Sequence, residues 1–160
     1  MTTQLTHAEL FSALAYQPDS GVFTWKKTGA IAGGPNFDGY IKIKVHQRWY
    51  LAHRLAWLYV HGIWPTQLID HINGDRVDNR IANLRDVSNS VNRQNARTAN
   101  ADSKTGILGV TLRKSKSKPR YQAQIAVNGK NKYLGMFDTE GEAHQAYLMA
   151  KREVHIGCTI

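Results

Sequence analysis

An aspartate followed directly by a histidine, with asparagines spaced behind them, is the part of this sequence best suited to chemistry. The pattern runs Asp70-His71-Ile-Asn-Gly-Asp, then Asn83-Leu-Arg, then Asn92. A neutral imidazole can take a proton from water near pH 7, and carboxylate and amide oxygens suit a hard cation such as Mg²⁺. These residue types therefore make the block a candidate site for acid–base or metal-assisted chemistry.

The whole block, rather than the Asp-His pair alone, resembles the HNH endonucleases of the ββα-metal class, especially the phage and homing types. His71, Asn83 and Asn92 fall at the three signature positions, and the similarity extends from the His53-Arg54 pair through Asn95. The resemblance implies a metal-dependent DNA endonuclease encoded by a phage or mobile element. It also implies a location in the cytoplasm of a bacterial host, near the nucleoid.

The resemblance further implies a role for each signature residue. His71 would be the general base, and Asp70 and Asn92 would bind Mg²⁺ or Mn²⁺. Asn83 would fix the loop between two strands through hydrogen bonds to the backbone and so keep His71 aimed. Ordinary turn chemistry remains open for Asn79 and Asn83, and Asp75 also fits a turn residue better than a ligand. Packing against the core is the favoured reading of His53.

The elements around this site predict an α+β fold. A capping box, Thr6 with Glu9, predicts a short helix over Ala8–Tyr16. Alternating patterns predict strands over 22–26 and 40–45, and the run 49–61 begins as a strand and continues as an amphipathic helix. Strands over 67–71 and 84–87 would flank the polar loop, with a polar helix after Ser88.

A second pattern follows residue 105. Alternation predicts strands over 109–114, 121–127 and 130–137, with Asn128-Gly129 as a two-residue hairpin turn. Thr139 would cap a helix over 140–154. The segment Tyr133-Leu-Gly-Met-Phe-Asp-Thr, followed by an alanine-rich helix, resembles the ethylene-response-factor (APETALA-type) DNA-binding domain. That resemblance implies a three-stranded sheet that lies in the major groove with the helix behind it.

Strand alternation places one set of side chains on the sheet face away from the helix, and a basic hairpin extends that face. Arginine suits guanine, while glutamine and asparagine suit adenine, and lysines suit phosphates. A solvated charged hairpin tip is the alternative for the basic loop. Leu108 and Ala126 replace arginines of the plant domains, so we expect a different sequence specificity. The predicted DNA-binding residues are Thr111, Arg113, Lys114, Lys116, Lys118, Arg120, Gln122, Gln124, Asn131 and Tyr133.

Composition favours an anionic partner. The 160 residues carry a net charge of +9 with a pI near 9.8 and a mean hydropathy of −0.45, which suits nucleic acid. We expect no membrane-spanning segment, no secretory signal and no disulfide-linked partner, since Cys158 is the single cysteine. The predicted domains are a nuclease domain over 1–97 (core about 49–97), a linker over 98–105 and a DNA-binding domain over 106–160.

Two other functions stay open at this point. A non-enzymatic DNA-binding regulator could carry a vestigial nuclease core, although such a protein would not need to keep Asp70, His71 and Asn92 together. An RNA-binding protein could carry the same basic hairpin. Double-stranded DNA is the partner that both resemblances favour.

Overall fold

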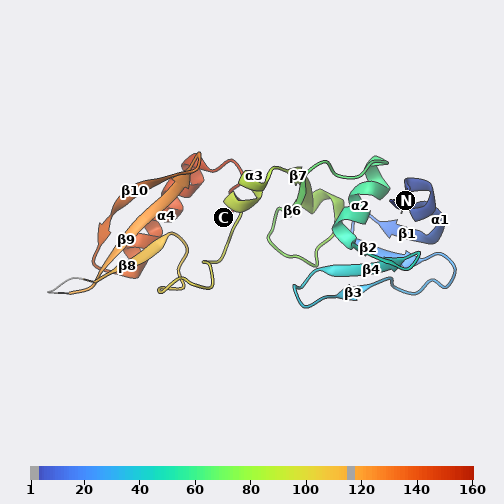
Figure 1. Ribbon diagram of the computed structural model, residues 1–160, viewed down its shortest axis with the longest axis horizontal. Helices are drawn as coiled ribbons and strands as arrows, with labels where there is room; N and C mark the ends of the chain where they lie inside the picture. The colour runs from blue at the N-terminus through green and yellow to red at the C-terminus, as the bar shows by residue number, and fades with distance from the viewer. Residues whose placement is uncertain (1–3, 115–117) are drawn as a thin grey trace. The chain divides into compact units, whose positions relative to one another are not determined.

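The computed structural model describes residues 4–114 and 118–160, which form two compact units that divide between Asn89 and Ser90. Both units combine helices with small antiparallel sheets (Figure 1), which confirms the predicted α+β class. The predicted boundaries of the nuclease domain, the linker and the DNA-binding domain stay a prediction. Residues 98–105 contain neither helix nor strand.

The first unit begins with helix α1 (His7–Ala13), which the expected capping box of Thr6 and Glu9 starts. The helix ends at Ala13 rather than at Tyr16, so this part of the sequence prediction is wrong. Residues 14–17 instead form strand β1 (Leu14–Gln17), which pairs antiparallel with β2 (Val22–Trp25). In this strand Leu14 and Tyr16 point to the core, and cross-strand pairing outweighs the local preference for helix.

A three-stranded sheet, β3–β4–β5, and one helix follow. Strand β3 (Gly34–Pro35) pairs with β4 (Ile41–Val45), which pairs with β5 (Arg48–Leu51). Helix α2 (Ala52–His61) continues directly from β5, as predicted, and ends at Gly62 with a left-handed backbone (φ 75°). The apolar face of α2 supplies much of the core of this unit. The buried residues include Leu10, Leu14, Phe23, Ile43, Val45, Leu55, Leu58 and Leu84.

The polar block of the sequence forms a hairpin in the first unit. Strand β6 (Leu68–His71) pairs antiparallel with β7 (Leu84–Val87), and the loop between them ends in a 3₁₀ turn, η1 (Ile81–Asn83). The predicted pair of strands around a polar loop is therefore present.

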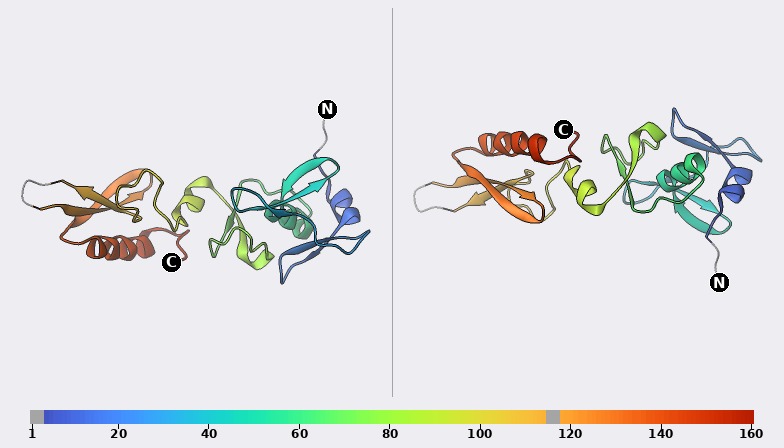
Figure 2. Two further views of the ribbon diagram at one scale, coloured as in Figure 1. Left: turned by 90° about the horizontal axis from the view of Figure 1, so that it is seen from below. Right: turned by 90° about the horizontal axis from the view of Figure 1, so that it is seen from above.

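The second unit contains a three-stranded sheet with one long helix on one face (Figures 1 and 2). Strands β8 (Val110–Arg113), β9 (Arg120–Val127) and β10 (Lys130–Phe137) pair antiparallel in the order β8–β9–β10. Helix α4 (Glu140–Val154) starts at the predicted Thr139 cap. The predicted hairpin turn has positive φ at Asn128 (51°) and at Gly129 (77°), the geometry of a tight two-residue turn.

Gly109, at the start of β8, shows how closely the sheet and helix approach. Its φ is +78°, and a Cβ atom there would lie 2.0 Å from Cδ2 of Tyr147 on α4. Any side chain at this position would displace the Tyr147 ring from the core. Glycine is therefore required by both backbone conformation and packing.

Candidate active site

The β6–β7 hairpin carries the residues for which the sequence predicts chemistry. In the register of the two strands, Asp70 lies opposite Arg85 and His71 lies opposite Leu84. Asp70 and His71 are both buried, with 6% and 5% of their surface exposed. Buried polar groups on a short hairpin need partners, and the structure supplies them from the loop and from the neighbouring strand.

His71 is the centre of the site. Its Nε2 atom lies 3.3 Å from Oδ1 of Asn79, and its ring packs edge-on against that of His53, with 5.0 Å between centroids and 90° between planes. The Tyr40 ring is 6.0 Å away. Burial lowers the pKa of His71, while Asn79 and nearby aspartates act in the opposite direction. A lowered pKa keeps the imidazole neutral near pH 7, the form that accepts a proton.

His53 comes from α2 and is the closest aromatic neighbour of His71. Only 5% of its surface is exposed, and its Nδ1 atom has no hydrogen-bond partner among the residues that the structure describes. Burial lowers the pKa of His53 to about 3, with smaller contributions from the charges of His71 and Arg54. His53 is therefore neutral at physiological pH. It packs in the core as the sequence suggests, but it does so against the candidate catalytic ring.

Asn83 holds the loop between β6 and β7. Its Oδ1 accepts the backbone N–H of Asn73 at 2.9 Å, and its Nδ2 donates to the backbone carbonyl of Asp78 at 2.8 Å. Its own carbonyl accepts the N–H of Ile72 at 2.8 Å. These bonds connect Asn83, at the end of the loop, to residues of the loop that follows His71 in the sequence. The catalytic assignment of Asn83 stays a prediction.

The loop is stiffened by charge as well. Arg80 donates to Asp78 through Nε at 2.8 Å and through Nη2 at 2.6 Å. Hydrogen bonds from Arg80 are the main reason that the pKa of Asp78 is lowered to about 2. Tyr16 of β1 donates its hydroxyl to the carbonyl of Asn79 at 2.7 Å, and burial raises the pKa of Tyr16 to about 12. The loop segment 78–80, which contains the Asn79 partner of His71, is thus held by bonds within the loop and by a bond to β1.

Asp70, the predicted metal ligand, has a cationic partner in this structure. Its Oδ2 accepts Nε of Arg85 at 2.8 Å and lies 2.7 Å from Nη2 of the same side chain. This ion pair is buried on the Asp70 side and partly exposed on the Arg85 side. A divalent cation bound at Oδ2 would thus share the Asp70 carboxylate with the positive charge of Arg85.

The chemistry of the donors decides what kind of cation could fit here. Within residues 4–114 and 118–160, no group of three or more His, Cys, Asp or Glu side chains forms a closed metal site. Mg²⁺ commonly takes one or two carboxylates and completes its shell with water and substrate phosphate. Asp70 beside His71 fits that mode of binding. The side chains present therefore suit a cation that also binds water and phosphate better than a cation enclosed by protein.

Asn92, the other predicted metal ligand, lies on helix α3 (Asn89–Gln94). From Ser90 onward this helix belongs to the second unit. Its C-terminal end is bound there: Oε1 of Gln94 accepts the N–H of Gly157 at 3.1 Å, and Oδ1 of Asn95 accepts the Thr159 hydroxyl at 2.6 Å. Asp70, His71 and Asn83 thus lie in the first unit, and Asn92 lies in the second. A metal-binding role for Asn92 stays a prediction.

The sheet of the second unit gathers most of the predicted DNA-binding residues on one face. Cross-strand register puts Thr111 opposite Gln122 and Tyr133 opposite Gln124. Arg113 donates to Oε1 of Gln122 at 2.8 Å, and Gln122 donates to Oε1 of Gln124 at 3.1 Å. This row of linked side chains lies on the face opposite the buried Val110, Ala123 and Ile125. We call it the polar sheet face; Arg120 and Asn131 extend it by register.

The predicted basic hairpin lies partly outside the described residues. Lys116 is in the segment 115–117, about which the structure says nothing. Lys114 is exposed. Lys118 and Arg120 both lie near Oδ1 of Asp138, at 3.1 and 3.5 Å. Because this pairing is solvent-exposed, it leaves both cations accessible to a phosphate.

Three residues of the site were not predicted from the sequence. Asn79 fitted a turn residue, yet it is 3% exposed and its amide lies against His71. Tyr40 carried no signal at all. Arg85 could have been found, since antiparallel strands that end at His71 and begin at Leu84 place residues 70 and 85 opposite each other.

Comparison with known proteins agrees with the placement of this site. The model of a family described as HNH endonuclease matches residues 50–94. No curated protein and no solved structure matches the chain. No helix in the described part of the chain is long and apolar enough to cross a membrane. The matched segment begins in β5, ends in α3 and includes every predicted catalytic and metal-binding residue, and it supports an HNH domain in this part of the chain.

Proposed function

We propose that this protein is a metal-dependent DNA endonuclease of the HNH type, which hydrolyses phosphodiester bonds with His71 as the general base. The observation that carries the proposal is the setting of His71. Its imidazole is buried, its pKa is lowered and a hydrogen-bonded loop fixes it, all within the segment that the HNH endonuclease family matches. A neutral, oriented imidazole is what activation of water at neutral pH requires.

The other side chains of the site have distinct roles in this proposal. Asp70 and Asn92 would hold a Mg²⁺ or Mn²⁺ ion, which when bound supplies positive charge to the phosphate and the leaving oxygen. Asn83 positions His71 through its two loop hydrogen bonds. Asn79, at 3.3 Å from Nε2, orients the imidazole.

The second unit would read duplex DNA with its polar sheet face. The linked Arg113, Gln122 and Gln124 side chains present donors and acceptors in a row, which suits the edges of base pairs in the major groove. The exposed Lys114 and Lys118 would contact phosphates. The likeness to ethylene-response-factor domains and the net charge of +9 support this part of the proposal.

The proposal is tested by incubating supercoiled plasmid with the purified protein in Mg²⁺, in Mn²⁺ and in excess chelator. We expect nicked or linear product with either metal and none in chelator. Sequencing the ends would give the target. A competition assay with duplex RNA as the competitor separates DNA from RNA as the ligand. Cleavage that continues undiminished in chelator would contradict the mechanism.

The Asp70–Arg85 ion pair favours one alternative, a DNA-binding regulator without nuclease activity. In such a protein the Asp70 carboxylate would have a structural partner and no need of a metal. The regulator predicts duplex binding without cleavage under every metal condition. The same plasmid assay, run beside a gel-shift titration, distinguishes the two.

A further inference from the structure

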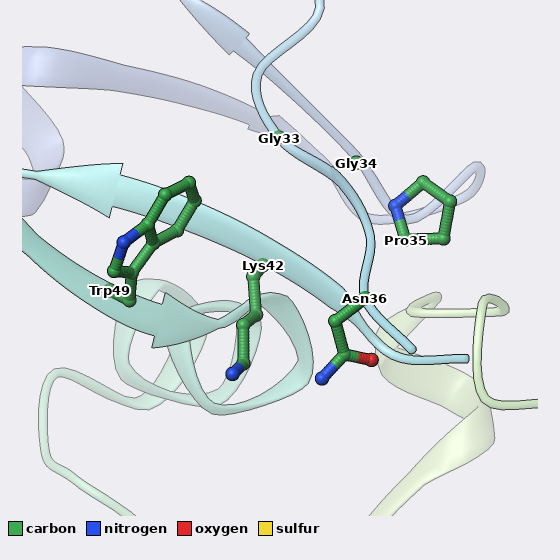
Figure 3. A pocket seen from close by; sticks show the side chains of 6 residues that line it. All are labelled: Gly33, Gly34, Pro35, Asn36, Lys42 and Trp49. Atoms are coloured by element: carbon green, nitrogen blue, oxygen red, sulfur yellow. The ribbon is translucent and has the colours of Figure 1, made fainter. Parts of the chain in front are cut away.

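A pocket lies on the first unit between the Gly33–Asn36 segment and the sheet beside it (Figure 3). Its volume is about 390 Å³, and its lining consists of Gly33, Gly34, Pro35, Asn36, Lys42 and Trp49. The side chains of Trp49, Lys42 and Asn36 line one side of the sheet in Figure 3. We call it the Trp49 pocket. Its volume is in the range of ligand pockets, roughly 300–1,000 Å³.

Trp49 is unusual because its ring does not take part in the core. Its surface is 63% exposed, whereas Ile43 and Val45 of the paired strand β4 are buried in the core on the opposite face of the sheet. Lys44, its cross-strand partner, holds Nζ 6.0 Å from the ring centroid. A large exposed aromatic side chain between lysines is a typical platform for a nucleic acid base.

The charge around the pocket suits a polyanion. Lys42 lies in the pocket and Lys44 is exposed beside it. No aspartate or glutamate occurs between Asp38 and Asp70, a stretch that includes β4, β5 and α2. The lysines are therefore not neutralised by acidic residues of their own strands, and they can attract phosphates on either side of a bound base.

The two glycines that line the pocket differ in what a side chain would meet there. Gly33 has a φ of +86°, and a Cβ there would lie 2.5 Å from the carbonyl oxygen of Lys42. Gly34 differs, because a Cβ at that position would meet nothing within 4 Å. Position 34 therefore accepts a side chain without strain, and that side chain would occupy the pocket.

The pocket is connected to the candidate active site through a short segment of the same unit. Oδ1 of Asn36 accepts the backbone N–H of Tyr40 at 2.8 Å. The Tyr40 ring then packs 6.0 Å from the ring of His71. Asn36 and Tyr40 thus link the lining of the pocket to the ring that packs against His71.

We propose that the Trp49 pocket binds an unpaired base of DNA, stacked on the Trp49 ring with Lys42 and Lys44 on the flanking phosphates. This inference rests on the proposed function, since the same strand would carry the phosphate that is cut near His71. A base inside a duplex cannot reach a pocket of this kind, so the base must be extrahelical or single-stranded. The substrate is therefore DNA with a locally open strand.

The test measures binding in chelator, where no cleavage occurs, using three labelled duplexes. One is fully paired, one carries a single bulged base, and one carries an abasic residue at the bulge. We expect the full-length protein to prefer the bulged base over both others by about tenfold, because loss of one stacked base costs about that much or more. Trp49→Ala and Gly34→Val should abolish the preference and keep the affinity for the paired duplex.

Phe37→Ala is the matched control, since it removes another exposed aromatic ring (95% exposed) that does not line the pocket. This variant should retain the preference. Equal affinity of the wild type for all three duplexes would overturn the proposal, as would a preference that survives Trp49→Ala. A wild-type dimer that Trp49→Ala dissociates would overturn it too, because the pocket would then be a protein contact.

Cleavage is measured separately with Mg²⁺. If the protein prefers the bulged base but cuts no DNA, the proposed nuclease activity is refuted and binding of a base by the Trp49 pocket is supported. If the protein cuts DNA without preferring the bulged base, the role of the pocket is refuted and the nuclease activity is supported.

Discussion

Replacing His53 by phenylalanine is expected to make the first unit less sensitive to acid. His53 is buried in α2 against His71, and its pKa is lowered from 6.5 to about 3. In the folded protein it therefore stays neutral at pH 5, whereas in the unfolded chain it takes up a proton below pH 6.5. The stability that depends on neutral His53 is complete above pH 6.5 and is lost as the pH falls towards 3.

The size of the effect follows from the pKa of His53, which is 6.5 in the unfolded chain and about 3 in the folded protein. Each pH unit below 6.5 costs about 1.4 kcal/mol per proton that only the unfolded chain binds. Between pH 8 and pH 5 the cost from His53 is therefore about 2 kcal/mol of unfolding free energy. His71, whose pKa is also lowered by burial, adds to the loss in the same direction. Phenylalanine keeps the aromatic packing and removes a ring nitrogen, Nδ1, for which the described part of the chain offers no hydrogen-bond partner.

Urea unfolding at pH 8 and pH 5 measures the effect. All four tryptophans lie in the first unit, so tryptophan fluorescence reports this unit alone. We expect His53→Phe to lose about 2 kcal/mol less than the wild type between the two pH values. His61→Gln, which removes an exposed histidine of the same helix, is the control and should behave like the wild type. An equal acid-dependent loss in the wild type and His53→Phe would refute the reasoning.

Three further predictions concern the loop, the second core and the basic hairpin. Asn83→Ala removes two loop hydrogen bonds and should lower the unfolding free energy of the first unit by about 1–3 kcal/mol; fluorescence-detected unfolding at wild-type stability would contradict it. Gly109→Ala forces a Cβ into the Tyr147 ring and should cost ~1–3 kcal/mol in a circular-dichroism melt. Gly141→Ala is the control, because a Cβ there meets nothing within 4 Å; equal melting temperatures of the two variants would refute the packing argument. Lys114→Gln should weaken binding to all duplexes alike and reduce the salt dependence in a gel-shift titration; a changed sequence preference would show that Lys114 contacts bases.

Elements whose signals are local were predictable from the sequence. The capping box of α1, the Asn128-Gly129 turn and the Thr139 cap of α4 depend on residues that are close in the chain, and all three are present. The end of α1 was not predictable in this way. Leu14–Gln17 leaves the helix because β2 offers it a partner, and the value of that pairing depends on the core that both strands cover.

The candidate site shows the same distinction. Asp70 and His71 stand out by residue type and spacing, so the hairpin that bears them could be placed from the sequence. Asn79 could not be distinguished from an ordinary turn residue, because its contact with His71 depends on how the loop folds back. The packing of His53 against His71 brings α2 close to β6, and the distance between these two elements cannot be predicted from residue types and spacing.

The central claim is that His71 activates water for hydrolysis of DNA. The most direct measurement compares the wild type with His71→Ala in plasmid cleavage with Mg²⁺, beside a gel-shift titration and a thermal melt of both proteins. We predict that cleavage falls by roughly 10²–10⁴-fold, the usual contribution of a general base, while DNA affinity and folding stay close to those of the wild type. Equal cleavage by the two proteins would contradict the account.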